Sequence, residues 1–277
     1  MRHNSLKTYI FPDDPVDVVI PCIDKDLETL ELCIAGIRNN CPQIREVIVV
    51  SSERLTENAA WFDERRYPFS KYEVALSLFN GEDENAEKYL SLPNSRLGWY
   101  YQQLLKFYAP FVIPNLSSNA LMLDSDTIFL NPVAFLNSSQ GGLYNPGFEY
   151  HPPYFVHAAK LTNNKIKRLY KMYSGISHHM LFQRAVLEDL FKQVESFHHQ
   201  EFWRAFCSCV NREELSQMGA SEYEIYFNFV LSQTDQVAIR PMQWRDISDI
   251  RELPLCKELG LHYVSCHHWK RAEAKKH

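Results

Sequence analysis

The chain has 277 residues, a formal net charge of −5 and a 45% share of hydrophobic residues. This length and composition are sufficient for one large α/β domain with a buried core. The near-balanced charge, with a pI near 6.1, argues against a strongly basic nucleic-acid-binding protein, so we expect no nucleic-acid partner.

The sequence contains no apolar run of the roughly 20 residues that a membrane-spanning helix needs. Its first residues lead into no apolar segment typical of a signal peptide. The seven cysteines are an odd number without a CxxC pair, which favours reduced thiols over a zinc site or disulfides. These features predict a cytoplasmic protein without a transmembrane segment.

A βαβ unit is predicted at the start of the chain. Residues 16–20 and 46–50 are short β-branched runs, which are typical of buried strands. Residues 26–39 between them carry apolar side chains at helical spacing. A strand, a helix and a strand in this order indicate a parallel sheet, in which ligands bind beyond the carboxyl ends of the strands.

The middle of the chain is predicted to contain one long helix followed by an acidic triplet. Residues 54–95 are polar and irregular, with a solvated loop at 81–84, whereas residues 96–112 form an amphipathic helix. The triplet Asp124-Ser125-Asp126 lies between two apolar runs that predict strands at 119–123 and 127–130.

The second half of the chain is predicted to be mainly helical. A loop rich in glycine and proline covers residues 141–153 and is a candidate wall of a binding site. Because no linker divides the sequence, we predict a single domain over residues 1–277. We expect helices at 163–173, 179–197, 199–209 and 222–232, and strands at 237–239 and 261–265.

The acidic triplet has a chemical logic at the end of a strand. Acidic residues separated by one residue on extended backbone point to the same side. Mg²⁺ and Mn²⁺ bind carboxylate oxygens and accept few protein ligands, which leaves positions for phosphate and water. Such a cation neutralises the charge that a diphosphate leaving group gains. An isolated D-x-D triplet is more often a solvated strand end, but here apolar strands flank it on both sides.

Four segments of the chain resemble the GT-A nucleotide-diphospho-sugar glycosyltransferases of the bacterial type. They occur in the expected order at residues 16–21, 96–106, 121–127 and 266–270. The resemblance implies an α/β GT-A fold with a mixed, mainly parallel sheet flanked by helices. It also implies a glycosyltransferase that uses Mn²⁺ or Mg²⁺, a nucleotide-sugar donor (expected to be a UDP-sugar) and a glycan or other hydroxyl acceptor. The nucleotide-sugar-binding half would then be residues 1–130, and the acceptor-binding half with a C-terminal metal-ligand segment residues 131–277.

The resemblance also implies a metal site of three residues. Asp124 and Asp126 would hold the metal and the diphosphate, and a late histidine would complete the metal shell. Because adjacent residues on extended backbone face opposite ways, we expect only one of His267 and His268 on the metal, and we prefer His267. Imidazole is a better ligand for Mn²⁺ than for Mg²⁺. The alternative is a polar C-terminal tail with hydrogen-bonded histidines.

Basic and polar side chains are expected beside the nucleotide. Lys270 would lie near the diphosphate as a point charge. Arg96 and Gln103 are two turns apart on one helix face, and Lys106 is a neighbour of Gln103. The resemblance places such a face near the nucleotide. The alternative is an ordinary solvated face of an amphipathic helix.

Two predicted helix starts supply candidates for the acceptor side. His178 and His179 are predicted to open a helix, where they could contact an acceptor hydroxyl or could simply be exposed imidazoles at a capped start. With Ser221 as the N-cap of another helix, Glu224 falls at the capping-box position and has a structural role. We therefore prefer Glu222 as the catalytic or acceptor-binding carboxylate, because an inverting transferase needs a base.

Two other classes of function stay open. A nucleotidyltransferase shares the sheet type and uses metal, but it normally has a Gly-rich loop after the first strand, and residues 21–25 contain no glycine. A noncatalytic protein that binds a glycan or a partner would keep the apolar strands without needing the carboxylates. Arg271, Lys275 and Lys276 could contact the inner face of an anionic membrane as a peripheral protein does, or could form a frayed end.

Overall fold

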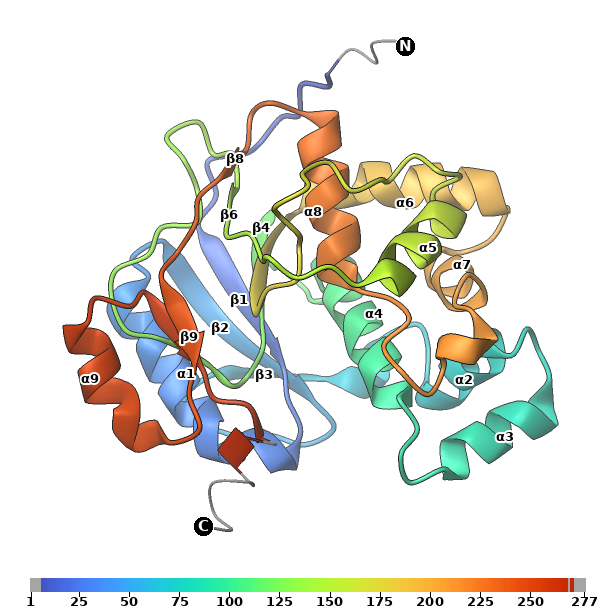
Figure 1. The fold of residues 1–277 in the computed structure, drawn as a ribbon, viewed down its shortest axis with the longest axis horizontal. Helices are drawn as coiled ribbons and strands as arrows, with labels where there is room; N and C mark the ends of the chain where they lie inside the picture. Colours follow the sequence, from blue (N-terminus) through green and yellow to red (C-terminus); the bar gives the residue numbers. More distant parts are fainter. Residues whose placement is uncertain (1–5, 269, 272–277) are drawn as a thin grey trace.

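The centre of this computed structural model, which describes residues 6–268, 270 and 271, is a five-stranded sheet (Figure 1). Its strands are β1 (Val16–Pro21), β2 (Ile44–Ser51), β3 (Ala60–Asp63), β4 (Asn119–Leu123) and β7 (His179–Gln183). They lie in the order β3-β2-β1-β4-β7, and all neighbours pair in parallel except β7, which is antiparallel to β4. The predicted α/β class with a mixed, mainly parallel sheet is therefore confirmed.

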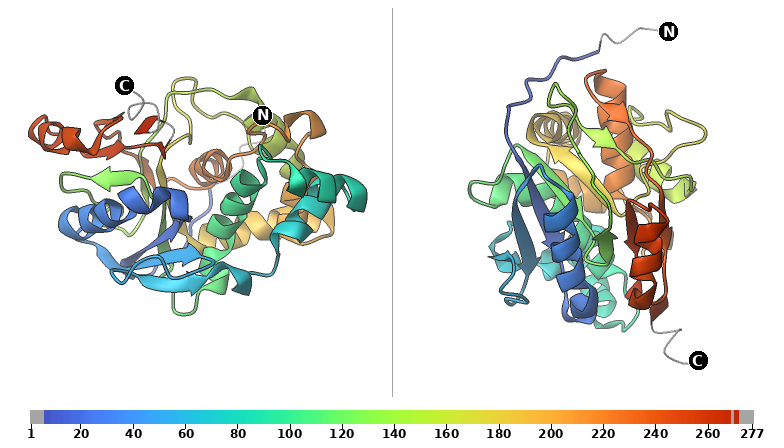
Figure 2. Two further views of the ribbon diagram at one scale, coloured as in Figure 1. Left: turned by 90° about the horizontal axis from the view of Figure 1, so that it is seen from below. Right: turned by 90° about the vertical axis from the view of Figure 1, so that its left-hand side faces the viewer.

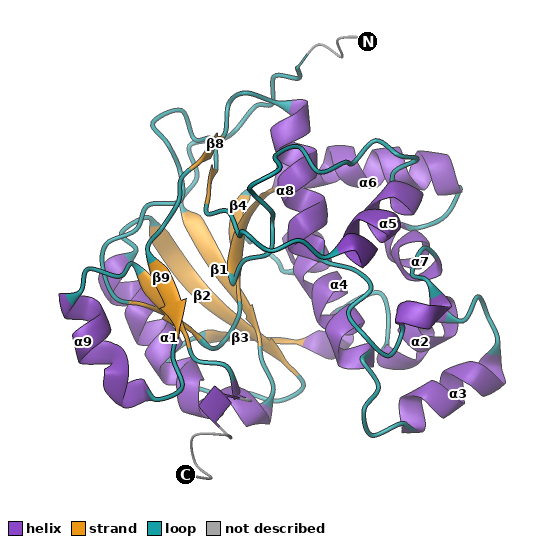
Figure 3. Cartoon of the chain, in the orientation of Figure 1, coloured by secondary structure: helices purple, strands orange, loops and turns teal. Residues whose placement is uncertain are grey.

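Nine α-helices surround the strands in the described part of the chain. Figure 3 shows α1 and α9 beside the strands on the left and the other helices gathered on the right. The helices are α1 (Leu27–Asn40), α2 (Lys71–Leu78), α3 (Asp83–Ser91), α4 (Leu97–Val112), α5 (Pro152–Leu161), α6 (Arg184–His198), α7 (Phe202–Ser208), α8 (Glu222–Gln233) and α9 (Leu253–Glu258). Single 3-10 turns are η1 (Asp24–Asp26), η2 (Glu64–Arg66), η3 (Arg212–Glu214) and η4 (Ile250–Glu252).

The strands β1 and β4 are buried along their whole length. Their nearly continuous apolar runs are typical of parallel strands that are covered on both faces. The exception in β1 is the fully buried Asp17, whose carboxylate accepts hydrogen bonds from Arg45 Nε (2.9 Å) and from the backbone N–H of Ser117 (2.7 Å). A buried charge of this kind is tolerated because its oxygens are bonded and paired.

A smaller sheet brings the end of the chain beside the acidic triplet. It consists of β5 (Thr127–Phe129), β10 (Tyr263–Ser265) and β9 (Trp244–Asp246). β10 pairs antiparallel with β5 and parallel with β9, so that Ser265 lies opposite both Thr127 and Asp246. Figure 2 shows this late segment packed against the first part of the chain. A further short pair joins β6 (Leu143–Tyr144) to β8 (Ala238–Ile239).

The predicted elements of the first βαβ unit, the long helix before the acidic triplet and the helix after Ser221 are confirmed as β1, α1, β2, α4 and α8. The prediction that residues 54–95 are irregular is wrong, because they contain β3, α2 and α3. The helix α2 begins with a capping box between Ser70 and Glu73. That short local signal was present in the sequence, but α2 has too weak an apolar face to be recognised by periodicity.

The helix predicted at 163–173 is also wrong, because residues 162–178 form no helix and lie across α8. The backbone N–H of Leu169 donates to Asn228 Oδ1 (3.1 Å), and that of Gly175 donates to Glu224 Oε2 (3.1 Å). At Gly175 a Cβ atom would lie 2.4 Å from the carbonyl oxygen of Tyr223, so this close approach requires glycine. Side-chain acceptors on α8 thus replace the internal hydrogen bonds of a helix.

The helix predicted at 179–197 begins only at Arg184, because residues 179–183 form strand β7. All five residues of β7 are buried and pair with β4, and the N–H of Asp124 extends the pairing to the carbonyl of His178 (3.1 Å). The next helix begins at Phe202, after His199 adopts a left-handed conformation with φ 55°. Pairing with the sheet decides between strand and helix here, because a short apolar run fits both.

In the part of the chain that the structure describes, no helix combines the length and apolar character needed to cross a bilayer. All seven cysteines fall in that part, where they are buried and free of disulfide bonds.

We expect the buried histidine on α5 to make folding sensitive to acid. His157 Nε2–H donates to the carbonyl of Phe206 (2.8 Å), and burial lowers the pKa of His157 to about 4. Its pKa in the unfolded chain is about 6.5, so between these values the unfolded state binds more protons. The contribution of His157 to the free energy of unfolding is therefore fully present above pH 6.5. It is lost as the pH drops towards 4, by roughly 1 kcal/mol for each pH unit.

Urea unfolding at several pH values measures this loss. The variant His157→Gln keeps a hydrogen-bond donor but does not titrate, so its free energy of unfolding should fall less between pH 6.5 and pH 4. An equal acid loss in both proteins would contradict the assignment to His157.

Candidate active site

A cleft of about 580 Å³ lies where β4 ends and α8 begins. The acidic triplet forms one wall, α4 a second and the start of α8 a third, while the segment after β10 closes one end. This is the carboxyl edge of a mainly parallel sheet, the usual position for a ligand site. The charged residues that line it include Arg96, Lys106, Asp124, Asp126, Glu222 and His267.

A second hollow of about 330 Å³ adjoins the cleft beyond the ends of β1 and β2. Pro21, the last residue of β1, and Val50, the penultimate residue of β2, line it, and Trp99 on α4 lines both hollows together with Arg96. The two hollows therefore adjoin along the carboxyl edge of the sheet with Arg96 and Trp99 as shared walls, and we refer to them together as the groove.

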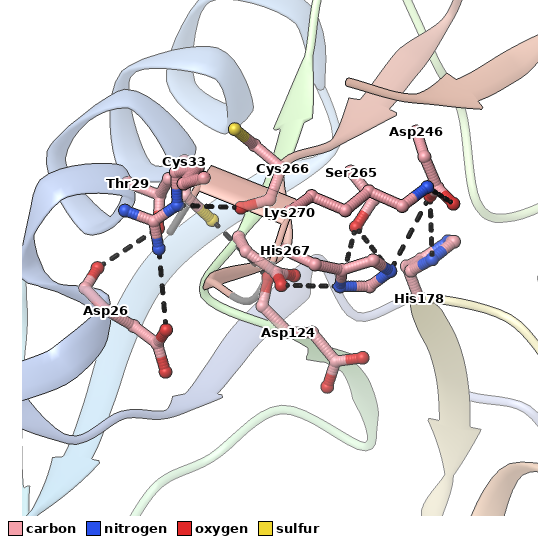
Figure 4. A network of polar contacts seen from close by, with 12 residues as sticks. Asp26, Thr29, Cys33, Asp124, His178, Asp246, Ser265, Cys266, His267 and Lys270 are labelled. Carbon is pink, nitrogen blue, oxygen red and sulfur yellow. Dashed lines mark hydrogen bonds and ion pairs between the residues drawn. The ribbon is translucent and has the colours of Figure 1, made fainter. Parts of the chain in front are cut away.

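His267 is the centre of a compact cluster of carboxylates and imidazoles (Figure 4). Its Nδ1 lies 2.8 Å from Asp126 Oδ2, and its Nε2 lies 3.6 Å from Asp246 Oδ1. His178 Nε2 is 3.8 Å from the same Asp246 oxygen, while Lys270 Nζ donates to Asp246 Oδ2 (2.6 Å). Strand pairing assembles the cluster, because β10 lies between β5 and β9.

The contacts within the cluster favour the charged forms of Asp126 and His267. Burial alone would raise the pKa of Asp126, but the hydrogen bond from His267 and the nearby imidazoles of His267 and His178 together outweigh it and lower that pKa. Burial alone would lower the pKa of His267, but its bond to Asp126 and the nearby Asp246 and Asp124 raise it. Burial lowers the pKa of His178 and favours its neutral form, which is the form that binds metals.

The cluster fits a divalent cation. Ligand atoms of His178, Asp246 and His267 lie within 4.8 Å of one another. Among the described residues, three buried atoms of the cluster have no hydrogen-bond partner, namely Asp126 Oδ1, Asp246 Oδ1 and His178 Nδ1. A buried polar atom without a partner costs free energy, and a bound cation would remove that cost for the carboxylate oxygens. Mixed carboxylate and imidazole donors suit Mn²⁺ among the candidate ions.

Asp124, the other acid of the triplet, is oriented away from this cluster (Figure 4). Its Oδ1 accepts from Lys106 Nζ (2.7 Å), and the same ammonium donates to Glu222 Oε1 (2.8 Å). The side chains of Lys106 and Glu222 are each only 4% exposed. Burial alone would lower the pKa of Lys106, but the two carboxylates hold it well above its ordinary value, whereas burial raises the pKa of Glu222. Lys106 thus ties α4 to both the triplet and α8.

The predicted site residues are distributed unevenly. Arg96, Gln103, Lys106, Asp124, Asp126, Glu222 and His267 all line the cleft. Lys270 binds Asp246, and His178 lies beside Asp246 at the metal-cluster end of the site. Gln103 is buried and donates to the carbonyl of Ala220 (3.1 Å), so its amide positions the start of α8.

The expectation that His178 and His179 open a helix is wrong, since β7 begins there. His179 is 3% exposed and packs against the rings of Phe129, Phe135 and Tyr263. Burial lowers its pKa to about 3, which keeps it neutral. His179 is absent from the cleft lining and contributes to the core, so it is a poor candidate for contact with an acceptor.

The start of α8 follows the predicted capping with one difference. Ser221 is the N-cap and its hydroxyl accepts from the N–H of Glu224 (3.2 Å). The carboxylate of Glu224, however, binds the N–H of Gly175 and the side-chain amide of Asn228 (2.6 Å). Glu224 therefore holds the 162–178 segment on α8, which leaves Glu222 as the carboxylate at the cleft.

Asp246 and Trp99 are site residues that were not predicted from the sequence. Asp246 ends the short strand β9, which has no apolar run to reveal it, and it reaches the cluster only through pairing with β10. Trp99 lies on the predicted helix between Arg96 and Gln103, where the same spacing argument could have found it.

Arg271, one of the C-terminal cations, is buried and cannot reach a membrane surface. Arg271 is 4% exposed; it pairs with Glu28 (2.9 Å), lies 3.6 Å from Asp26 and donates to the carbonyl of Cys266 (3.0 Å). The expectation that Arg271 contacts a membrane is therefore wrong. Lys275 and Lys276 lie outside the described residues.

The sheet and the cleft define an α/β protein with a carboxylate–imidazole site at the carboxyl edge of its strands. The chain belongs to DUF6492, a family of unknown function, whose match covers residues 1–250. His267 and Lys270 lie beyond that match. Among solved structures the chain is similar to mouse xyloside xylosyltransferase 1 in its apo form, with 11% identity over 92% of this chain and 94% of that chain and a TM-score of 0.42. No curated protein matches the chain.

Proposed function

We propose that the protein is a metal-dependent glycosyltransferase that moves a sugar from a nucleotide diphosphate donor, expected to be UDP-linked, to a hydroxyl of a glycan or other acceptor. The observation that carries the proposal is the pair of buried carboxylate oxygens without a hydrogen-bond partner, Asp126 Oδ1 and Asp246 Oδ1, around His267, at the end of a groove large enough for a nucleotide and a sugar.

The metal ligands of this proposal are Asp126, Asp246 and His267, with His178 beside them. Mn²⁺ or Mg²⁺ bound there would neutralise the charge that the diphosphate gains as the sugar leaves. Compared with the metal site expected from the sequence, Asp246 takes the place of Asp124 as a ligand. Asp124 is held by Lys106, so we assign it to orienting the diphosphate or the ribose rather than to direct ligation.

The donor would occupy both hollows. We place the nucleoside in the smaller hollow beside Trp99, where the indole can pack against a base or a ribose. Arg96 lies between the two hollows and can bind phosphate oxygens in a bidentate manner. The sugar would then face the start of α8.

Glu222 is the proposed base for the acceptor hydroxyl. Burial raises its pKa towards the range in which a carboxylate accepts a proton efficiently, while the bond from Lys106 keeps it ionised before the reaction. Lys106 positions Glu222 and Asp124 together, so it couples the acceptor side to the donor side. His178 lies too close to Asp246 to be assigned to the acceptor, and we place it with the metal cluster.

Calorimetric titration with UDP, with and without Mn²⁺, tests the donor site, and release of UDP from a panel of UDP-sugars tests turnover. We expect Mn²⁺-dependent UDP binding and release of UDP from at least one donor. Glu222→Gln should retain UDP binding but lose transfer, because the amide cannot take the proton. Binding without turnover of any donor would indicate a noncatalytic binding protein, and no binding with any metal would contradict the proposed site.

A further inference from the structure

A second feature of the surface lies outside the groove. Residues 148–172 expose an unusual number of large apolar side chains. Met172 is 73% exposed, Phe148 64% and Tyr150 55%, and three more side chains are at least 42% exposed. Exposed apolar side chains gathered in one region mark interaction sites, whereas single ones are normal. The six are Phe148, Tyr150, Val156, Leu169, Tyr170 and Met172.

Ring contacts link several of these side chains across α5, and we name the exposed side chains of residues 148–172 the 148–172 face. The ring centroids of Phe148 and Tyr173 are 5.9 Å apart, and those of Tyr170 and Tyr173 are 6.1 Å apart. The guanidinium of Arg168 lies 4.5 Å from the ring centroid of Tyr150. The residues on either side of α5 thus meet through aromatic contacts rather than lying as separate loops.

The same face is strongly basic. Residues 148–172 contain five cations and one carboxylate, Glu149, and so carry a net charge of +4 (five minus one), whereas the whole chain carries −5. Lys160 and Lys165 donate to the neutral amides of Asn211 and Gln193. The remaining cations are Lys167, Arg168 and Lys171. Positive charge is therefore concentrated on one part of an otherwise acidic protein.

The face is anchored and lies next to the cleft. Asn228 and Glu224 on α8 hold the 162–178 segment at Leu169 and Gly175. Figure 1 shows this segment crossing α8 near α5. The cleft lining includes Tyr154, which lies within residues 148–172, and residues 176–177, which follow them.

We propose that the 148–172 face binds the surface of an anionic lipid bilayer. Lysine and arginine near such a surface are each stabilised by about 1 kcal/mol, and aromatic and aliphatic side chains enter the interface between headgroups and acyl chains. Phe148, Leu169 and Met172 have no side-chain group that hydrogen-bonds well to a sugar, which favours lipid over an acidic glycan as the partner. The face binds lipid whether or not the groove transfers sugar.

Binding of the 148–172 face to a bilayer also determines how the cleft is oriented towards the membrane. Because Tyr154, within residues 148–172, lines the cleft, binding would bring the cleft opening close to the bilayer surface. An acceptor carried on a membrane would then reach the start of α8 without leaving the lipid.

The test is sedimentation of the full chain with vesicles of phosphatidylcholine alone or of equal parts phosphatidylcholine and phosphatidylglycerol. We expect binding to the anionic vesicles that weakens with added salt, and little binding to the neutral ones. Lys167→Gln/Lys171→Gln should weaken binding roughly thirtyfold, from about 1 kcal/mol for each cation. Phe148→Ser/Met172→Ser should remove the fraction of binding that resists salt.

The matched control is Lys88→Gln/Lys257→Gln, which removes two exposed cations on α3 and α9, outside the 148–172 face. It should bind like the parent chain, and thermal melting of each variant verifies folding. Equal binding to both vesicle types, or equal losses in the control and face variants, would overturn the proposal. Binding of soluble polygalacturonate without binding of anionic vesicles would overturn it in favour of a glycan surface.

Discussion

Asp126→Asn is expected to abolish Mn²⁺-dependent UDP binding and to lower kcat/KM for donor cleavage on the order of 10³-fold. Changes in the partners of metal ligands already cost about 10–100-fold, and loss of a charged ligand costs more. Asn keeps the size of the side chain and can still bond to His267, so the effect isolates the carboxylate charge. Calorimetric titration of Mn²⁺ in the presence of UDP measures the binding, and UDP release measures the rate.

Two further variants make this result specific. Asp246→Asn should weaken Mn²⁺ binding by a comparable factor, although Asp246 lies 120 positions from Asp126 in the sequence, because β9 and β10 bring it to the same histidine. Asp235→Asn removes an exposed carboxylate before β8 and should change neither readout. Full Mn²⁺–UDP binding by Asp126→Asn would mean that the cluster is not the metal site.

Lys106→Met is expected to cause the largest loss of stability. Among the described residues, Lys106 is the only cation within hydrogen-bond distance of both Asp124 and Glu222, and its loss leaves Glu222 charged and 4% exposed. Removing one partner of a buried ion pair costs about 3–5 kcal/mol. The lower end applies here, since the side chain of Asp124 is 28% exposed and can be hydrated. Calorimetry should show a Tm lower by roughly 6–12 °C, at about 2–4 °C for each kcal/mol.

A double variant separates charge from packing. In Lys106→Met/Glu222→Gln the buried carboxylate is replaced by a neutral amide, so much of the lost Tm should return. Both proteins should lack transfer activity, because each has lost Glu222 or its partner. Lys88→Met, at an exposed lysine on α3, should leave Tm within about 2 °C, since surface changes alter stability by less than about 0.5 kcal/mol. An unchanged Tm in Lys106→Met would contradict the structural role of Lys106 between Asp124 and Glu222.

The sequence predicted elements well where burial imposes a clear pattern. The strands β1, β2 and β4 each contain a run of apolar residues, and α4 has a strong apolar face, so each carries its own signal. The prediction failed at β7 and at residues 162–178. β7 is a strand because its backbone pairs with β4, and residues 162–178 are not helical because α8 supplies their hydrogen bonds. Neither partner is local in the sequence.

The candidate site likewise combines features that the sequence predicted with features that appear only in the structure. The sequence by itself determined a carboxylate triplet after a buried strand and a carboxylate at the start of α8, because strand ends and helix caps depend on neighbouring residues. Only the tertiary structure decided that Asp126 turns towards His267, 141 positions away, while Asp124 turns towards Lys106. It also brought Asp246 into the cluster and placed His179 in the core. The physical reason is that the pairing of β5, β10 and β9 sets the distances within the cluster and the pairing of β7 with β4 places His179, and such pairing depends on contacts between distant segments that no local pattern encodes.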